Sequence, residues 1–185
     1  IVVVDNHPAS GVTPPIVERF PHIKLVSELR QGVAYARNAG IAACSGDIIV
    51  TVDDDVVVPD CWLEKLLAPF ARPDVRAVTG NVLPFELETS AQQTFEAFGS
   101  GGLGRGYYRF EVGPDWFERS WRHAVPTWLL GGTANSAYRA DVFSDTRVGL
   151  MNEALGPGMP SGVGEDIYLF YKVLKSGGTI CYEPA

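Results

Sequence analysis

Acidic side chains gather in two short stretches of this chain. Residues 53–55 are three consecutive aspartates directly after the apolar run 48–52, and residues 164–166 read Gly-Glu-Asp before an amphipathic stretch. Carboxylates can hold a divalent cation or accept a proton. Either stretch could therefore take part in catalysis.

The three aspartates follow an expected buried strand, at the end of the sheet where open α/β proteins bind their ligands. Strand alternation would point Asp53 and Asp55 to the same side. Two carboxylates on one side suit a hard divalent ion that takes its remaining ligands from water and substrate phosphates. An acidic surface turn is the alternative, and the largely apolar strand before it favours the functional interpretation.

Glu165 and Asp166 precede an expected helix. A carboxylate there would cap the helix and face the positive end of its dipole, which is a structural role. Because adjacent residues do not share a helix face, the two have different surroundings, and one could be a general base while the other is structural. The residues alone do not decide which.

Composition limits the kinds of protein this chain can be. Its 185 residues, 46% hydrophobic and 20% charged, predict one globular domain, and a net charge of -7 argues against a large nucleic-acid surface. The 3 cysteines and 3 histidines are scattered, so we expect neither a disulfide framework nor a zinc site, and we expect a reducing, cytoplasmic setting. Any metal must rest on carboxylates.

The order of apolar runs predicts an α/β fold. Residues 1–4 and 48–52 are typical of strands buried on both faces of a parallel sheet, and the small side chains of 31–44 predict a close-packed helix between them as a βαβ unit. We also expect a helix opened by Pro59 and capped by Asp60, and further elements in three ranges: a strand at 76–83, a helix at 166–175 and a strand at 179–182.

The stretch 99–106 holds five glycines and is expected to be a mobile loop, a flap that orders over a bound donor. It matches the pattern G-x-G-x-x-G. The strand before it and the helix after it that a dinucleotide site requires are missing, so we reject that interpretation.

Five stretches, in order, resemble the family 2 inverting glycosyltransferases of GT-A fold, and the resemblance covers nearly the whole chain. They are Asp5-Asn6 after a strand, GVAYARNAG at 32–40, DDD at 53–55, GGTAN at 131–135 and GED at 164–166, with GGTICYEP closing the chain at 177–184. The resemblance implies a single Rossmann-like domain with a mostly parallel central sheet flanked by helices. Residues 1–83 would form the nucleotide-binding half and 84–185 the acceptor and catalytic half.

The resemblance also assigns the donor site, for a nucleotide-diphosphate sugar whose base is expected to be uridine. Asp5 would contact the base, Arg37 would lie near the base or the pyrophosphate, and Asp53 would hold the ribose. Asp55 would coordinate Mg²⁺ or Mn²⁺ on the diphosphate. Asp53 would belong to the same metal-binding set, and Asp54 would lie beside them. Taken without the resemblance, Asp5 could be a turn residue and Arg37 a solvated helix residue.

For the reaction itself, the resemblance implies that Asp166 is the base that deprotonates the acceptor hydroxyl, with Glu165 in the same catalytic pair. Gly131 and Gly132 would allow close approach of the sugar or the acceptor, which could be a saccharide, a lipid or another hydroxyl compound. Trp128 could be a stacking platform, although a core position is the commoner fate of a tryptophan among leucines.

Two other functions fit parts of the sequence. Residues 53–57 match the D-x-D-x-[TV] pattern of phosphatases and phosphotransferases of the haloacid dehalogenase type, with Asp53 as nucleophile and with Thr79 and Lys172 in the remaining roles. That motif normally opens its domain, whereas a βαβ unit precedes it here. The second alternative function is a module that binds a nucleotide sugar without catalysis, and such a module would not need Asp166.

The resemblance also predicts segments beyond this sequence. Relatives have a first strand upstream of the position of Ile1, and many continue past the final strand to a histidine or a basic-aromatic motif. We therefore expect weak or no sugar transfer by residues 1–185 alone. Membrane association, if any, is expected only through such segments.

Overall fold

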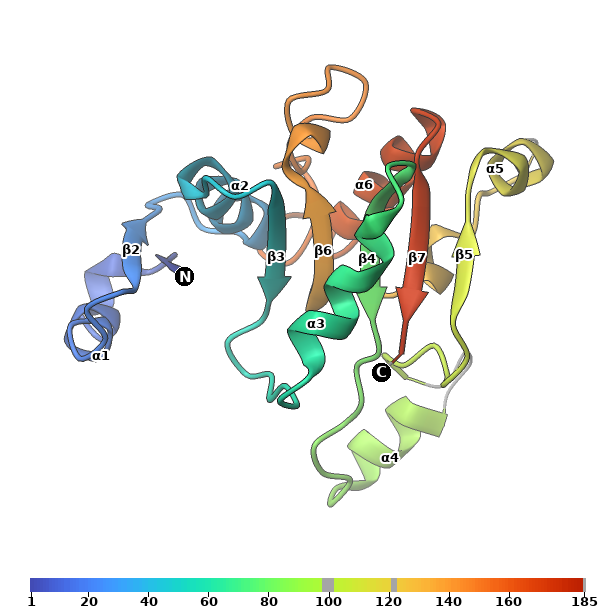
Figure 1. Cartoon of the computed structure of the whole chain (residues 1–185). Helices are drawn as coiled ribbons and strands as arrows, with labels where there is room; N and C mark the ends of the chain where they lie inside the picture. The colour runs from blue at the N-terminus through green and yellow to red at the C-terminus, as the bar shows by residue number, and fades with distance from the viewer. Residues whose placement is uncertain (98–101, 121–122, 185) are drawn as a thin grey trace.

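A five-stranded mixed sheet forms the centre of the molecule in the computed structural model, which describes residues 1–97, 102–120 and 123–184 (Figure 1). The strands lie side by side in the order β3 (Ile48–Val52), β6 (Asn135–Arg139), β4 (Val75–Gly80), β7 (Thr179–Glu183) and β5 (Phe110–Val112). Helices cover both faces. The α/β class and the central sheet flanked by helices are therefore as the sequence predicted.

The pairing within this sheet differs from the expected mostly parallel arrangement. β3, β4 and β7 run in one direction, but β6 lies between β3 and β4 and is antiparallel to both. β4 and β7 are parallel neighbours, and β5 is antiparallel to β7. The prediction of mostly parallel pairing is wrong because β6 and β5, which come from the second half of the chain, run against the other three strands.

The first strand belongs to a separate parallel pair, β1 (Val2–Asp5) with β2 (Lys24–Ser27), and β2 was not foreseen. The predicted βαβ unit of residues 1–4, 31–44 and 48–52 is therefore wrong. β1 leads through η1 (Pro8–Ser10) and α1 (Thr13–Val17) to its parallel partner β2, and only then does α2 (Val33–Ala43) lead to β3, which lies in the other sheet. The expected close packing of that helix is present: a Cβ on Gly40 would lie 3.1 Å from Cγ2 of Val4. The prediction of burial on both faces is wrong for both strands: Val2 to Val4 are half-buried, and β3 is an edge strand in which only Ile49 is buried.

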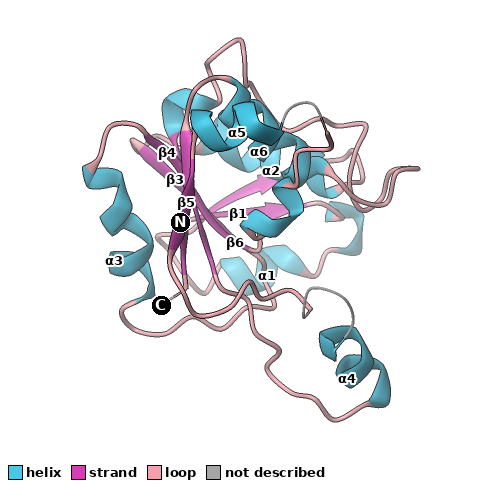
Figure 2. Cartoon of the chain, turned by 90° about the vertical axis from the view of Figure 1, so that its right-hand side faces the viewer, coloured by secondary structure: helices cyan, strands magenta, loops and turns pink. Residues whose placement is uncertain are grey.

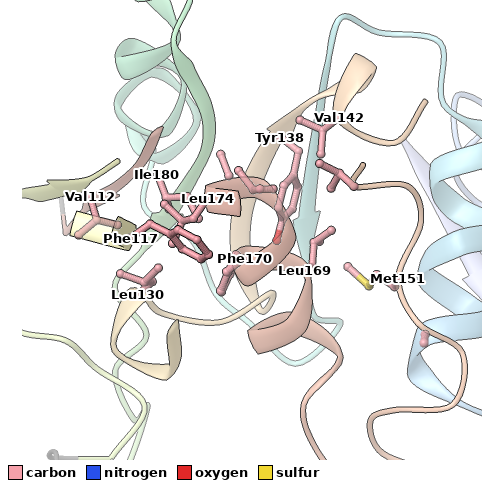
Figure 3. Close-up of a cluster of buried hydrophobic side chains, with 14 residues drawn as sticks. Val112, Phe117, Leu130, Tyr138, Val142, Met151, Leu169, Phe170, Leu174 and Ile180 are labelled. Carbon is pink, nitrogen blue, oxygen red and sulfur yellow. The ribbon is translucent and has the colours of Figure 1, made fainter. Parts of the chain in front are cut away.

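Alternate side chains of the central strands enter two cores, one on each face of the sheet. Tyr138 and Ile180 point toward α6 (Glu165–Lys175), where they pack with Phe170 in the cluster of Figure 3. Their chain neighbours Ala137 and Cys181 belong to the cluster on the α3 face. Figure 2 shows α3 (Trp62–Leu67) on one face and α5 (Pro114–Ser120) with α6 on the other.

The helix after the aspartates begins later than predicted. Its N-cap is Cys61 and no side chain caps it, so the predicted capping by Asp60 is wrong. A backbone bond from Trp62 N to the Pro59 carbonyl opens the helix instead. The helix continues into η2 (Ala68–Ala71), where Phe70 is buried.

Residues 84–130 hold more regular structure than the sequence predicted. Besides β5 and α5 they form α4 (Ser90–Ala97) and η3 (Thr127–Leu130), and η4 (Ala140–Val142) follows β6. α4 projects away from the sheet and buries no residue (Figures 1 and 2). Residues 98–101, which include the start of the expected flap, lie outside the described part. No helix in the described ranges is long and apolar enough to span a bilayer.

Candidate active site

Arg37, on α2, joins the two acidic stretches. Its Nη2 donates to Oδ1 of Asp53 at 2.6 Å, and its Nη1 donates to Oε1 of Glu165 at 3.4 Å. The Arg37 side chain is only 14% exposed. The turn after β3 and the start of α6 are therefore neighbours, which the sequence could suggest only through resemblance.

Glu165 is the buried member of its pair, with a side chain 8% exposed. Gly156, in the loop before α6, lies directly against it: at φ +99°, a Cβ there would be 2.7 Å from Oε2. Burial raises the pKa of the Glu165 carboxyl above its usual range, and the Arg37 charge opposes that rise to a smaller extent. These surroundings suit a residue that positions Arg37.

Asp166 has more open surroundings. It is half-buried, its Oδ1 accepts from the Ile167 amide at 2.7 Å, and its Oδ2 lies 3.5 Å from the place a Cβ on Gly132 would take. The N-cap of α6 is Gly164, so neither acidic residue occupies the cap position. Of the two carboxylates, Asp166 is the one with space beside it.

Gly131 and Gly132 have different roles in the backbone. Gly131 has φ +102°, and a Cβ there would lie 2.9 Å from Cβ of Thr79. The Thr79 hydroxyl donates to the carbonyl of Leu130 and holds this segment in place. Gly131 is thus required for the close approach of two protein segments, while Gly132 borders Asp166.

Asp5 ends β1, and its two carboxylate oxygens have different surroundings. The residue is 4% exposed, and Oδ1 accepts from the His7 amide at 3.0 Å, as in the predicted turn. Within the described residues, Oδ2 is buried without a hydrogen-bond partner. A buried carboxylate oxygen without a donor is costly, so a ligand that donates to it would be favoured.

Asp54 and Asp55 are exposed in the turn that follows β3. Because β3 ends at Val52, strand alternation does not extend to the aspartates, and that part of the sequence argument does not apply. Exposed carboxylate oxygens fit a hydrated divalent cation with substrate phosphates. Within residues 1–97, 102–120 and 123–184, no group of three or more His, Cys, Asp or Glu side chains is placed so that it could hold a metal ion.

Comparison with known proteins identifies the family. The family model described as "Glycosyl transferase family 2" matches residues 1–146. The chain belongs to glycosyl transferase family 2. Its β1, α2 and Asp53–Asp55 turn all lie within the matched residues.

The relatives are longer proteins. The pre-mycofactocin glycosyltransferase of Mycobacterium tuberculosis is 29% identical over 91% of this chain and 30% of its own length. The uncharacterized glycosyltransferase YibD of Escherichia coli K12 is 30% identical over 68% of this chain and 34% of its own length. This chain thus spans about a third of each of these two relatives.

A solved structure confirms the GT-A fold. The mannosyltransferase PcManGT from Pyrobaculum calidifontis, in complex with GDP-Man and Mn²⁺, aligns with a TM-score of 0.56 at 20% identity. The alignment covers 98% of this chain and 46% of that one.

Family 2 membership does not favour the phosphatase interpretation, and neither does the geometry. Thr79 is fully buried and bonded to the Leu130 carbonyl. Lys172 donates to the backbone carbonyl of Leu150 at 2.8 Å. Asp53 is engaged by Arg37, so the residues needed for the phosphatase roles are committed elsewhere.

Trp128, expected as a stacking platform or as core, is 44% exposed. The core alternative is therefore wrong, because η3 turns this side chain outward while Leu130 is buried. Its stacking role stays a prediction. The segment around it is fixed to α6 by the Thr127 hydroxyl, which donates to the Ile167 carbonyl at 3.0 Å.

Asn38 is a positioning residue that the sequence analysis missed. Its Nδ2 donates to the Met151 carbonyl at 3.0 Å, and its Oδ1 accepts from the Met151 amide at 2.9 Å. These two bonds fix α2 to the loop that leads to Gly156 and α6. The sequence signal was an asparagine directly after Arg37 in the expected helix 31–44, because such a residue needs partners for its amide if the helix buries it.

Proposed function

We propose that the protein transfers a sugar from a nucleotide-diphosphate sugar to an acceptor hydroxyl, with inversion and with a divalent cation. The observation that carries the proposal is the Arg37 bridge in a family 2 chain. It holds the aspartate turn beside α6, and it leaves Asp166 open next to Gly132.

At the donor end, we assign the base to Asp5. Its buried Oδ2 can only accept, so it favours a base edge that presents an N–H donor, as uracil and guanine do. Uridine is the base implied by the family resemblance. GDP-Man in the mannosyltransferase neighbour shows that guanosine belongs among the donors to test.

For the diphosphate, Asp55 would hold the cation, Mg²⁺ or Mn²⁺, with Asp54 beside it. Both are exposed, whereas Asp53 keeps its Oδ1 on Arg37. We therefore assign Asp53 to a ribose hydroxyl through its other oxygen, and not to the metal. The bound cation would supply Lewis-acid stabilisation of the negative charge on the leaving diphosphate.

At the acceptor end, Asp166 would take the proton of the attacking hydroxyl. The acceptor oxygen forms a bond to the anomeric carbon as the bond from that carbon to the diphosphate oxygen breaks, and attack opposite the leaving group inverts the centre. A positioned general base contributes about 10²–10⁴-fold to such a step. Glu165 would stay buried and hold Arg37 in place.

Two neighbouring variants of the whole protein test this assignment. Asp166→Asn should lower kcat about 100-fold or more, because the amide cannot accept the proton, and it should leave nucleotide affinity within about twofold. Glu165→Gln keeps the shape of the buried side chain and should lose much less activity. Equal losses in the two variants, or an unchanged kcat in Asp166→Asn, would contradict the assignment of the base.

A further inference from the structure

An apolar cavity, widely open to solvent, lies between β5, α5 and η3, separate from the aspartate turn. Its volume is about 360 Å³. The described residues that line it are Arg105, Phe110, Val112, Trp116, Leu129 and Leu130. Five of the six are apolar, and the volume is within the range of small-molecule sites, about 300–1,000 Å³.

Arg105 is the one charged residue among these lining residues, and its side chain is held by neutral groups. Its Nε donates to the Trp128 carbonyl at 3.0 Å, and Nη1 donates to the carbonyls of residues 102–104. Its backbone amide is fixed by the Tyr182 hydroxyl at 3.3 Å.

No ion pair joins this guanidinium to a carboxylate in the part of the chain that the structure describes. Its hydrogen-bond acceptors there are backbone carbonyls, which carry no formal charge. A guanidinium that has no carboxylate partner among the described residues, beside an apolar cavity, favours a ligand that brings the anion itself.

The cavity shares η3 with the proposed catalytic site. Leu130 lines the cavity, and two residues later Gly132 borders Oδ2 of Asp166. Thr127, at the start of η3, bonds to the carbonyl of Ile167, the residue after Asp166. One short segment thus connects the cavity wall with the segment that carries the proposed base.

We propose that this cavity binds the non-reacting end of the acceptor, a compact apolar group that carries one anionic group. The apolar group would pack on Trp116 and Leu129, and Arg105 would contact the anion. The identification of this ligand as the acceptor rests on the proposed function. The inference that the cavity binds an apolar molecule with an anionic group is independent of the proposed function.

The test uses isotope-labelled protein and two matched probes, 4-phenylbutanoate and the uncharged 4-phenylbutanamide, followed by amide and indole chemical shifts. We expect shifts centred on the Trp116 indole and the Phe110 and Leu130 amides. The carboxylate should bind roughly tenfold more tightly than the amide because it gains a charge-assisted hydrogen bond.

Three variants separate charge from shape. Arg105→Gln should abolish the preference for the carboxylate, and Arg105→Lys should retain most of it. Leu129→Trp should weaken both probes alike, because the larger side chain fills the cavity, and the half-exposed position of Leu129 tolerates it. Equal affinity of the wild type for both probes, shifts confined to other residues, or a preference that survives in Arg105→Gln would each overturn the proposal.

The same sample, titrated with UDP or GDP and Mg²⁺, distinguishes this inference from the proposed function. Nucleotide binding without binding of 4-phenylbutanoate would overturn the cavity inference and leave the donor site supported. Binding of 4-phenylbutanoate without nucleotide binding would support the cavity as an anion site and overturn the proposed function.

Discussion

Arg37 Nη2 lies 2.6 Å from Asp53 Oδ1, and the same guanidinium lies 3.4 Å from Oε1 of Glu165. One residue of α2 therefore sets the position of the turn after β3 relative to the first turn of α6. Because Glu165 is buried, its carboxylate depends on this cation.

Removal of Arg37 should destabilise the fold. We expect Arg37→Gln to lower the free energy of unfolding by roughly 2 kcal/mol, since it leaves the buried Glu165 carboxylate without a cation. Urea unfolding measures this. The matched control is Arg147→Gln, which removes the exposed Arg147 from its pair with Asp145 and should change stability by less than about 1 kcal/mol. A similar cost for both variants would contradict a structural role for the bridge.

Gly131 should not tolerate a side chain. Gly131→Ala places a Cβ 2.9 Å from Cβ of Thr79 at φ +102°, so we expect a loss of about 2 kcal/mol or more. Gly11→Ala is the control, because Gly11 also has positive φ, +67°, but open space around it. The control should lose about 1 kcal/mol. The packing explanation fails if thermal or urea unfolding shows equal losses.

Replacement of Gly132 by alanine should leave stability nearly unchanged but reduce activity. A Cβ there would make an ordinary 3.5 Å contact with Oδ2 of Asp166. We expect Gly132→Ala to change stability by less than about 1 kcal/mol and to reduce kcat/KM about tenfold, because the methyl group takes the space beside the proposed base. Full activity in this variant would place the acceptor hydroxyl away from Gly132.

Much of the fold could be predicted from the sequence because, in particular segments, the apolar residues had a clear periodicity and glycines marked where helices and strands end. The small residues of 31–44 predicted α2, and the amphipathic stretch after Gly164 predicted α6. β2 was missed because it has only four residues, none of them buried, and so carries little pattern. β6 was missed as a strand because Asn135 and Ser136 are polar, although the sheet buries them.

The candidate site was predictable by residue type and not by arrangement. The sequence offered two acidic stretches, and the family resemblance connected them. That Glu165 is buried and Asp166 is open follows from Gly156, which packs against Glu165 from a loop that no local pattern predicts. Tertiary contacts of this kind decide between two adjacent carboxylates, and a single sequence does not contain them.

The raised pKa of Glu165 gives a testable dependence of stability on pH. Its ordinary value is 4.5 and burial raises it in the folded state. As pH rises from about 4.5 toward the folded value, the unfolded chain loses this proton first, so the folded state binds more protons and stability falls through that window. Above the folded value the contribution is constant.

Comparison with Glu165→Gln isolates this contribution, because glutamine does not titrate. The unfolding free energy of the wild type minus that of the variant should decrease as pH rises above 4.5 and then level off. Urea titrations at several pH values between about 4 and 8 measure the difference. A difference that increases with pH would mean that Arg37, and not burial, dominates the pKa of Glu165.

The most direct measurement is the calorimetric affinity for UDP and GDP, with and without Mn²⁺, in the wild type, Asp55→Asn and the control Asp60→Asn. We expect that binding of at least one nucleotide requires the cation, weakens about tenfold or more in Asp55→Asn and is unchanged in Asp60→Asn. Nucleotide affinities that do not change with the cation or with Asp55→Asn would rule out a metal-dependent donor site at the aspartate turn.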